Sequence, residues 1–244
     1  MDVTNFPPIG ALLVSKMIME EGAKPGFLYR EKRADEEDSG WRIFSGQESD
    51  EYAQENDNFG LYSASEVLAI DPSLAALLLK GVGSVYERDE QGEWMKIVDF
   101  EMEDNYIETH ALTNTWQLDI NHLFERKVEE GGDLLYTTGD KSLRLTIWKD
   151  DSKSRQQLYT ETLQSIEHRE EDEAPTLESF EFSDDNAAKT GYMILESDGV
   201  TEYHVIYGFN IADGEVLMSV FYFDDAADRE WALQTWQGIR AVKA

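Results

Sequence analysis

Two acid–histidine pairs are the residues of this sequence whose types and spacing could do chemistry. Glu108 lies two positions before His110, and Glu167 directly precedes His168. A carboxylate beside an imidazole can act as a general acid–base pair that moves protons to and from a reacting group. The chain holds 51 acidic residues, however, so such neighbours also arise by chance. We therefore expect structural roles for both pairs.

Other patterns of the sequence match no catalytic or cofactor template. The glycines form neither GxGxxG after a strand nor a P-loop, no serine lies in a GxSxG elbow, and the four histidines lack HExxH spacing. Acidic runs at 35–38, 170–173 and 184–185 could hold a hard cation, but they lack the alternating ligands of a calcium loop. We expect no catalytic residue, no cofactor and no metal site. A hydrolase that uses a carboxylate pair is one alternative function, but no motif of the sequence supports it.

Negative charge dominates the composition. The 244 residues include 51 Asp and Glu against 21 Lys and Arg, which gives a formal net charge of −30 at pH 7. Such a charge repels nucleic acid and anionic membranes, and it steers positively charged proteins toward the chain. We expect a basic protein partner, no nucleic-acid partner and no membrane partner. The simpler alternative is an acidic surface that serves solubility alone.

The N-terminal segment and the absence of cysteine bear on the compartment. Asp2 stands where a signal peptide needs positive charge, and Ser15 and Lys16 interrupt the apolar run that follows. Without cysteine there is no disulfide, thiolate nucleophile or cysteine-ligated metal. An apolar content of 41% is typical of a folded chain despite the charge. We expect a cytoplasmic protein.

The first hundred residues combine strand and helix signals. Ser63 and Glu66 form a capping box that predicts a helix, and Asp71-Pro72 begins a second predicted helix that Gly81 ends. Apolar runs bounded by turn residues predict strands at 10–19, 41–44, 82–86 and 94–98.

The second half of the sequence predicts a larger sheet. Asp-Gly pairs at 198–199 and 213–214 are typical of hairpin turns. Predicted strands span 116–120, 134–138, 143–148, 177–182, 192–196, 201–210 and 215–223, and helices span 156–166 and the segment around Trp231 and Trp236. We predict an α+β fold with two domains, each a mostly antiparallel sheet packed with helices. The predicted domains are 1–100 and 115–244, joined by a linker at 101–114.

Four separated motifs in the first domain carry a family resemblance. They are GWRIFSG at 40–46, NFGLYS at 58–63, the Asp71-Pro72 pair, and GVGSVYER at 81–88. In this order they resemble a bacterial domain family associated with polymorphic-toxin immunity proteins, over about residues 11–98. The resemblance implies a protein that binds and silences a cognate toxin secreted by a type VI or contact-dependent system. It implies no fixed catalytic residues.

The second domain is more faintly similar to the PsbP-like α/β/α sandwich. The residues that carry this likeness are 116–124, LRLTIW at 143–148, and SVFYF at 219–223 before a tryptophan-containing helix. This resemblance implies an accessory or binding module and not an enzyme.

Charge and resemblance together predict an immunity protein for a basic nuclease toxin. A nuclease must be basic to hold its substrate, so an acidic inhibitor would associate quickly and block the substrate-binding or active site. The alternative is a non-catalytic acidic binding, scaffold or adaptor module for a secretion component, and the oligomeric state stays open. The expected contact residues are Asp35, Glu36, Glu37, Asp38, Glu48, Asp50, Glu51, Asp57, Glu170, Glu171, Asp172 and Glu173.

Overall fold

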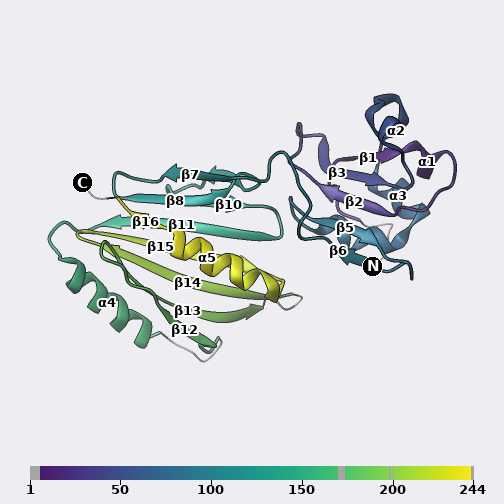
Figure 1. The fold of residues 1–244 in the computed structure, drawn as a ribbon. Helices are drawn as coiled ribbons and strands as arrows, with labels where there is room; N and C mark the ends of the chain where they lie inside the picture. The colour runs from purple at the N-terminus through teal and green to yellow at the C-terminus, as the bar shows by residue number, and fades with distance from the viewer. Residues whose placement is uncertain (1–5, 170–173, 198, 200, 243–244) are drawn as a thin grey trace. The chain divides into compact units, whose positions relative to one another are not determined.

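The chain divides into two compact units, Met1–Tyr106 and Ile107–Ala244. A computed structural model describes residues 6–169, 174–197, 199 and 201–242 (Figure 1). None of the described helices is long and apolar enough to cross a membrane. Both units combine mostly antiparallel sheets with helices, which confirms the predicted α+β class.

A six-stranded sheet with the order β4-β1-β3-β2-β5-β6 forms the first unit. Strand β1 runs parallel to β3, and the other neighbouring pairs are antiparallel. The strands are β1 (Ala11–Ser15), β2 (Phe27–Arg30), β3 (Asp38–Phe44), β4 (Phe59–Tyr62), β5 (Val85–Arg88) and β6 (Trp94–Lys96). The predictions missed β2, whose four residues directly follow the Pro25-Gly26 turn, and they extended β1 into the next helix.

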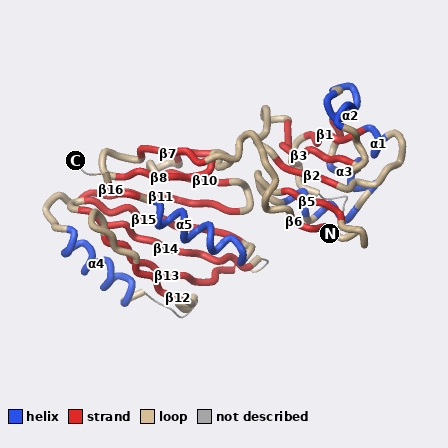
Figure 2. Tube along the Cα trace, viewed as in Figure 1, coloured by secondary structure: helices blue, strands red, loops and turns tan. Residues whose placement is uncertain are grey.

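Short helices lie between β1 and β2, between β3 and β4, and between β4 and β5; Figure 2 draws helices in blue. They are α1 (Lys16–Met19), α2 (Asp50–Gln54), η2 (Asn56–Asn58), α3 (Ala64–Ile70), η3 (Pro72–Ala75) and η4 (Leu77–Leu79). The capping box is confirmed, because Ser63 N donates to the Glu66 carboxylate at 2.8 Å and the Ser63 hydroxyl accepts from Glu66 N at 3.3 Å.

The single helix predicted between Asp71 and Gly81 is wrong, because this segment forms the two 3₁₀ helices η3 and η4. Asp71 caps η3, and the carbonyl of Leu78 accepts a hydrogen bond from the Trp41 indole at 3.1 Å. Leu78 is among the last four residues of the predicted helix, whose carbonyls have no partner within a helix, so this bond satisfies a carbonyl at the end of the segment.

One face of the six-stranded sheet packs against α3, η3 and η4. Alternate residues of the strands point into this core, as the pleat of a strand requires. The fully buried apolar residues of the strands are Leu12, Val14, Leu28, Trp41 and Ile43, and they meet Val67, Leu68, Leu74 and Leu78 of the helices.

The second unit contains two sheets whose neighbouring strands all pair antiparallel. The larger has the order β12-β13-β14-β15-β11-β10-β9, and the smaller has the order β16-β8-β7. Their strands are β7 (Ile107–Ala111), β8 (Trp116–Asn121), β9 (Glu125–Val128), β10 (Leu134–Thr137), β11 (Lys141–Lys149), β12 (Glu178–Glu181), β13 (Ala188–Ser197), β14 (Glu202–Ala212), β15 (Glu215–Phe223) and β16 (Arg240–Ala241). The helices are α4 (Arg155–Glu167), η5 (Ala226–Asp228) and α5 (Arg229–Gly238).

The segment predicted as a linker, 101–114, contains a strand, so that part of the prediction is wrong. Residues Ile107–Ala111 form β7 and pair with β8. The side chains of β7 that turn inward are the polar residues Glu108 and His110, so the strand has no apolar alternation to detect.

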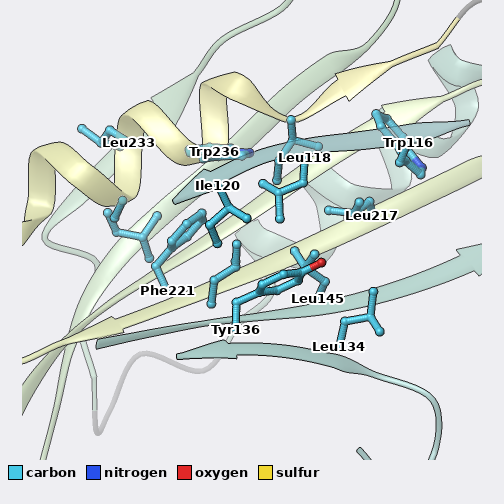
Figure 3. Packing of buried hydrophobic residues seen from close by; sticks show 14 of the residues in the cluster. Trp116, Leu118, Ile120, Leu134, Tyr136, Leu145, Leu217, Phe221, Leu233 and Trp236 are labelled. Carbon is cyan, nitrogen blue, oxygen red and sulfur yellow. The ribbon is translucent and has the colours of Figure 1, made fainter. Parts of the chain in front are cut away.

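The large sheet of the second unit is covered on both faces. Helix α5 and strand β8 cover one face, where Figure 3 shows Leu118, Ile120 and Trp236 gathered over the residues of the sheet. Helix α4 covers the other, where Leu158 packs with Val216. Val216 and its neighbour Leu217 belong to the two different cores, because successive residues of a strand point to opposite faces.

Two glycines allow α5 to approach the large sheet. A Cβ atom at Gly208 would lie 2.5 Å from Cε2 of Trp236, and one at Gly191 would lie 2.7 Å from Cη2 of the same ring. Trp236 is fully buried, so the ring has no room to move away.

We predict that Gly208→Ala lowers the free energy of unfolding by about 1–3 kcal/mol, because the added methyl overpacks the Trp236 contact. Gly238→Ala is the matched control, since a Cβ there meets nothing within 4 Å, and it should change stability by less than about 1 kcal/mol. Urea unfolding of the full chain, followed by circular dichroism, measures both. Equal effects of the two substitutions would contradict this account of the helix–sheet contact.

Candidate protein-binding surface

The acidic residues predicted to contact a partner differ in how the structure uses them. Six are exposed: Asp35, Glu36 and Glu37 before β3, Asp50 and Glu51 in the first turn of α2, and Asp57 in η2. Asp38 and Glu48 are half-buried and bonded within the first unit. The cluster Glu170, Glu171, Asp172 and Glu173 lies outside the described residues.

Glu48 holds the turn that follows β3. Its carboxylate accepts hydrogen bonds from the backbone N–H groups of Ser45 at 2.8 Å, Gly46 at 2.9 Å and Gln47 at 3.1 Å. Burial alone would raise the pKa of Glu48, but the hydrogen bonds outweigh it and hold the pKa below its ordinary value. Glu48 therefore has a structural role in this turn.

Asp38 forms an ion-pair network with Arg42 and Glu31. The Arg42 guanidinium donates to both Asp38 oxygens, at 2.9 and 2.8 Å, and to Glu31 Oε1 at 2.6 Å. The hydrogen bonds from Arg42 hold the pKa of Asp38 well below its usual range, although burial opposes this. Two carboxylates share one guanidinium, so the network keeps a net negative charge.

The sheet face opposite the core carries aromatic side chains. Phe27 of β2 is paired with Phe44 of β3, and Tyr29 is paired with Arg42. Because side chains alternate along a strand, these four residues point away from the core residues of the same strands. The ring centroids of Phe27 and Phe44 lie 6.0 Å apart, and those of Tyr29 and Phe44 also lie 6.0 Å apart in a stacked arrangement.

Neighbouring segments extend this group of rings. Phe59 of β4 meets Phe44 edge-on with centroids 5.4 Å apart, and Tyr52 of α2 meets Phe59 at 6.0 Å. Phe100, which follows β6, lies 5.2 Å from Tyr29. All of these rings are half-buried, so each keeps part of its surface in contact with solvent.

The two edge strands add exposed aliphatic side chains to the same face. Leu61 of β4 is 69% exposed and Met95 of β6 is 54% exposed. Met95 is paired with Glu87, and Glu87 with Phe27, which places them on the side of the rings. Phe59 and Leu61 are two residues apart in β4 and share that side. We call this set the aromatic face: Phe27, Tyr29, Phe44, Phe59, Leu61, Met95 and Phe100.

Of the strands that carry the aromatic face, β3 and β6 were predicted from the sequence, and the face itself was not. In strand β3, Trp41 is fully buried in the core, whereas Phe44 is half-buried on the opposite side. The sequence pattern that could have revealed the aromatic face is a strand with apolar residues on both sides. The FLYR segment of β2 is such a strand, because Leu28 alternates with Phe27 and Tyr29. A strand with apolar side chains on both sides is either buried on both faces of its sheet or leaves one apolar face that a binding partner can cover.

The acid–histidine pair at Glu108 is part of a larger network in the second unit. Glu108 is hydrogen-bonded to His110 and to His122, each at 2.9 Å, and the other ring nitrogen of His110 lies 2.9 Å from the Tyr136 hydroxyl. The hydrogen bonds from His110 and His122 hold the pKa of Glu108 below its ordinary value against the effect of burial. The network ties β7 to His122, which directly follows β8, and to Tyr136 of β10, so we interpret it as structural.

Removing Arg42 leaves Asp38 and Glu31 without their shared cation. We predict that Arg42→Gln lowers the free energy of unfolding at pH 7 by about 2 kcal/mol, because a poorly exposed carboxylate loses its partner. The pKa of Asp38 is lower in the folded state than in the unfolded state. The stability that its ion pair contributes is therefore fully present above the unfolded-state pKa, and it is lost as the pH falls through the folded-state pKa. The difference from wild type should therefore shrink below about pH 4.

The control for this substitution is Lys127→Gln. Lys127 and Glu125 form an ion pair at 3.3 Å whose side chains are 50% and 48% exposed, so its loss should cost less than about 1 kcal/mol. Urea unfolding at several pH values compares the variants. A difference for Arg42→Gln that persists unchanged at low pH would show that charge is not its cause.

The first unit matches a known family. Residues 12–98 match the family model of the Immunity protein Imm33 domain, which confirms the resemblance predicted for about residues 11–98. The matched range includes the whole aromatic face apart from Phe100, together with the Arg42 network. A search of curated proteins gives no match.

Similar solved structures share the chain's fold only loosely. They include a crystal structure from Bacteroides thetaiotaomicron VPI-5482, at 11% identity and a TM-score of 0.38, which covers 52% of this chain and 45% of that chain. The solution structure of cyanobacterial PsbP (CyanoP) from Synechocystis sp. PCC 6803 matches at 8% identity and a TM-score of 0.42, over 60% of this chain and 97% of that chain. The Ran-binding protein Mog1p of Saccharomyces cerevisiae matches at 12% identity and a TM-score of 0.34, over 54% of this chain and 84% of that chain.

The PsbP likeness is the one that the sequence predicted for the second domain. At such low identity and TM-score, these neighbours say nothing of what the second unit binds. The family match is the firmer finding: residues 12–98 of this chain match the model of the Imm33 immunity protein domain.

Proposed function

We propose that this chain is an immunity protein that binds a cognate bacterial toxin and neutralises it. The observation that carries the proposal is the match of residues 12–98 to the Imm33 immunity protein domain. An immunity protein acts by occupying its toxin, so binding and not catalysis is the activity proposed for the chain. It acts in the cytoplasm, where the toxin reaches its target.

The charge of the chain supports a basic toxin, and we propose a nuclease effector of a type VI or contact-dependent system. A nuclease holds phosphates with Lys and Arg side chains. A chain with a net charge of −30 competes for those side chains, and long-range attraction speeds the encounter. Blocking the substrate-binding or active site of the nuclease would then neutralise it.

Expression of the effector encoded beside this gene tests the proposal. Cells that produce the effector alone should die, and cells that also produce this chain should grow. The purified pair should form a stoichiometric complex. Killing that is the same with and without this chain would overturn the proposal, whereas a complex with a secretion component and no protection would favour an adaptor.

We predict that the double variant Glu51→Lys and Asp57→Lys associates with the effector at least about tenfold more slowly than wild type at low salt. The difference should shrink as salt screens the charges. Glu130→Lys with Glu202→Lys is the control, because these residues are exposed in the second unit and the change in net charge is equal. Surface plasmon resonance at several ionic strengths measures the rates. Equal slowing by both variants would mean that net charge alone matters.

A further inference from the structure

We propose that the aromatic face of the first unit is the surface on which the toxin docks, and that the toxin presents an apolar patch bordered by Lys and Arg side chains. This inference rests on the proposed function and names its contact surface. The proposed contact surface is the aromatic face, whose residues are distinct from the acidic clusters predicted from the sequence.

The aromatic face gathers seven apolar side chains on one side of the six-stranded sheet. Its strand residues lie on β4, β3, β2 and β6, from Leu61 on the edge strand β4 to Met95 on the opposite edge strand β6. Between these two exposed side chains the rings of Phe27 and Phe44 form a continuous contact series with Phe59. A contiguous apolar surface of this kind marks an interaction site, whereas isolated exposed residues do not.

Aromatic side chains on a sheet suit a protein interface. Phe and Tyr rings bring large apolar area at little cost in conformational entropy, and they are common among the residues that dominate binding energy. Tyr29 lies between the Phe44 and Phe100 rings, and its cross-strand partner Arg42 is fixed by the bonds to Asp38. The surface is therefore ordered before binding, which reduces the entropy lost on association.

Carboxylates border the aromatic face and indicate the chemistry of its partner. Glu87 lies within the face, exposed, between its paired neighbours Phe27 and Met95. Exposed Asp99 and Glu101 flank Phe100 in the sequence. Arg and Lys side chains from a partner can pair with these carboxylates and lie over the rings.

The same charges oppose a second copy of this chain as the occupant. Each copy has a formal net charge of −30, and a symmetric dimer through this face would bring Glu87 and its neighbouring acids together. Like charges placed opposite each other across an interface cost binding energy. A basic partner removes that repulsion and covers the apolar surface at once.

Loss of apolar contact is tested with Leu61→Ser and Met95→Ser in the full chain. Both side chains are well exposed, so the fold is kept. Each substitution should weaken the Kd for the effector encoded beside this gene by about fivefold or more. Ile70→Ser is the control, because Ile70 is 41% exposed on α3 and lies outside the face; it should change the Kd by less than about twofold.

The contribution of charge is tested with Glu87→Lys against Glu90→Lys. Glu90 is exposed in the turn between β5 and β6, so both variants change the net charge by the same amount. Glu87→Lys should weaken the Kd by about tenfold or more, with the effect greatest at low salt, and Glu90→Lys by less than about threefold. Isothermal titration calorimetry measures the Kd, and circular dichroism checks that each variant is folded.

Each outcome decides between the two proposals. If the effector binds wild type and all the variants equally, the aromatic face is not the docking surface, and the proposed function stands. If the effector does not bind the wild-type chain, the proposed function and the inference both fall. If light scattering shows a wild-type dimer that Leu61→Ser dissociates, the face belongs to a second copy of the chain and the inference is overturned.

Discussion

In strand β3, Trp41 and Ile43 point into the core of the first unit, while Arg42 and Phe44 point to the opposite face. The pleat of the strand imposes this division, because successive side chains must leave a strand on opposite sides. The same four residues therefore anchor the fold and supply the binding surface. The core side needs the helices α3, η3 and η4, and the other side keeps its rings partly exposed.

In a chain with so many acidic residues, the carboxylates differ in whether the fold itself compensates their charge. Those that are half-buried are compensated locally: Asp38 by Arg42, Glu48 by three backbone N–H groups, and Glu108 by two histidines. Some exposed acids also bond within the fold, as Glu66 does in the capping box, but the mutual repulsion of so many exposed acids lowers stability. A basic partner that neutralises them stabilises the folded chain as it binds.

Strong local signals made much of the fold predictable. The Ser63 capping box, the Asp213-Gly214 turn and the helix through Trp236 each specify their structure with a few adjacent residues. The missed elements depend on distant partners instead. Strand β7 is held by pairing with β8, and the Leu78 carbonyl of η4 accepts a hydrogen bond from Trp41, 37 residues away in the sequence.

The acidic residues predicted to contact a partner also depend on structure that the local sequence does not reveal. Exposed and internally bonded carboxylates look alike in a sequence, so Asp38 and Glu48 were grouped with Glu51 and Asp57 although they hold the fold together. The aromatic face was missed because the side of a strand that an aromatic residue occupies depends on the register of the sheet, which short-range patterns do not fix.

Carboxyl-group footprinting of the full chain, with and without the effector, tests the central claim most directly. The label modifies exposed Asp and Glu side chains, which cover both units of this acidic chain. The account predicts that Glu87, Asp99 and Glu101 lose labelling in the complex, while Glu90 and the acids of the second unit keep it. Protection confined to residues 107–244, with Glu87 labelled as in the free chain, would contradict it.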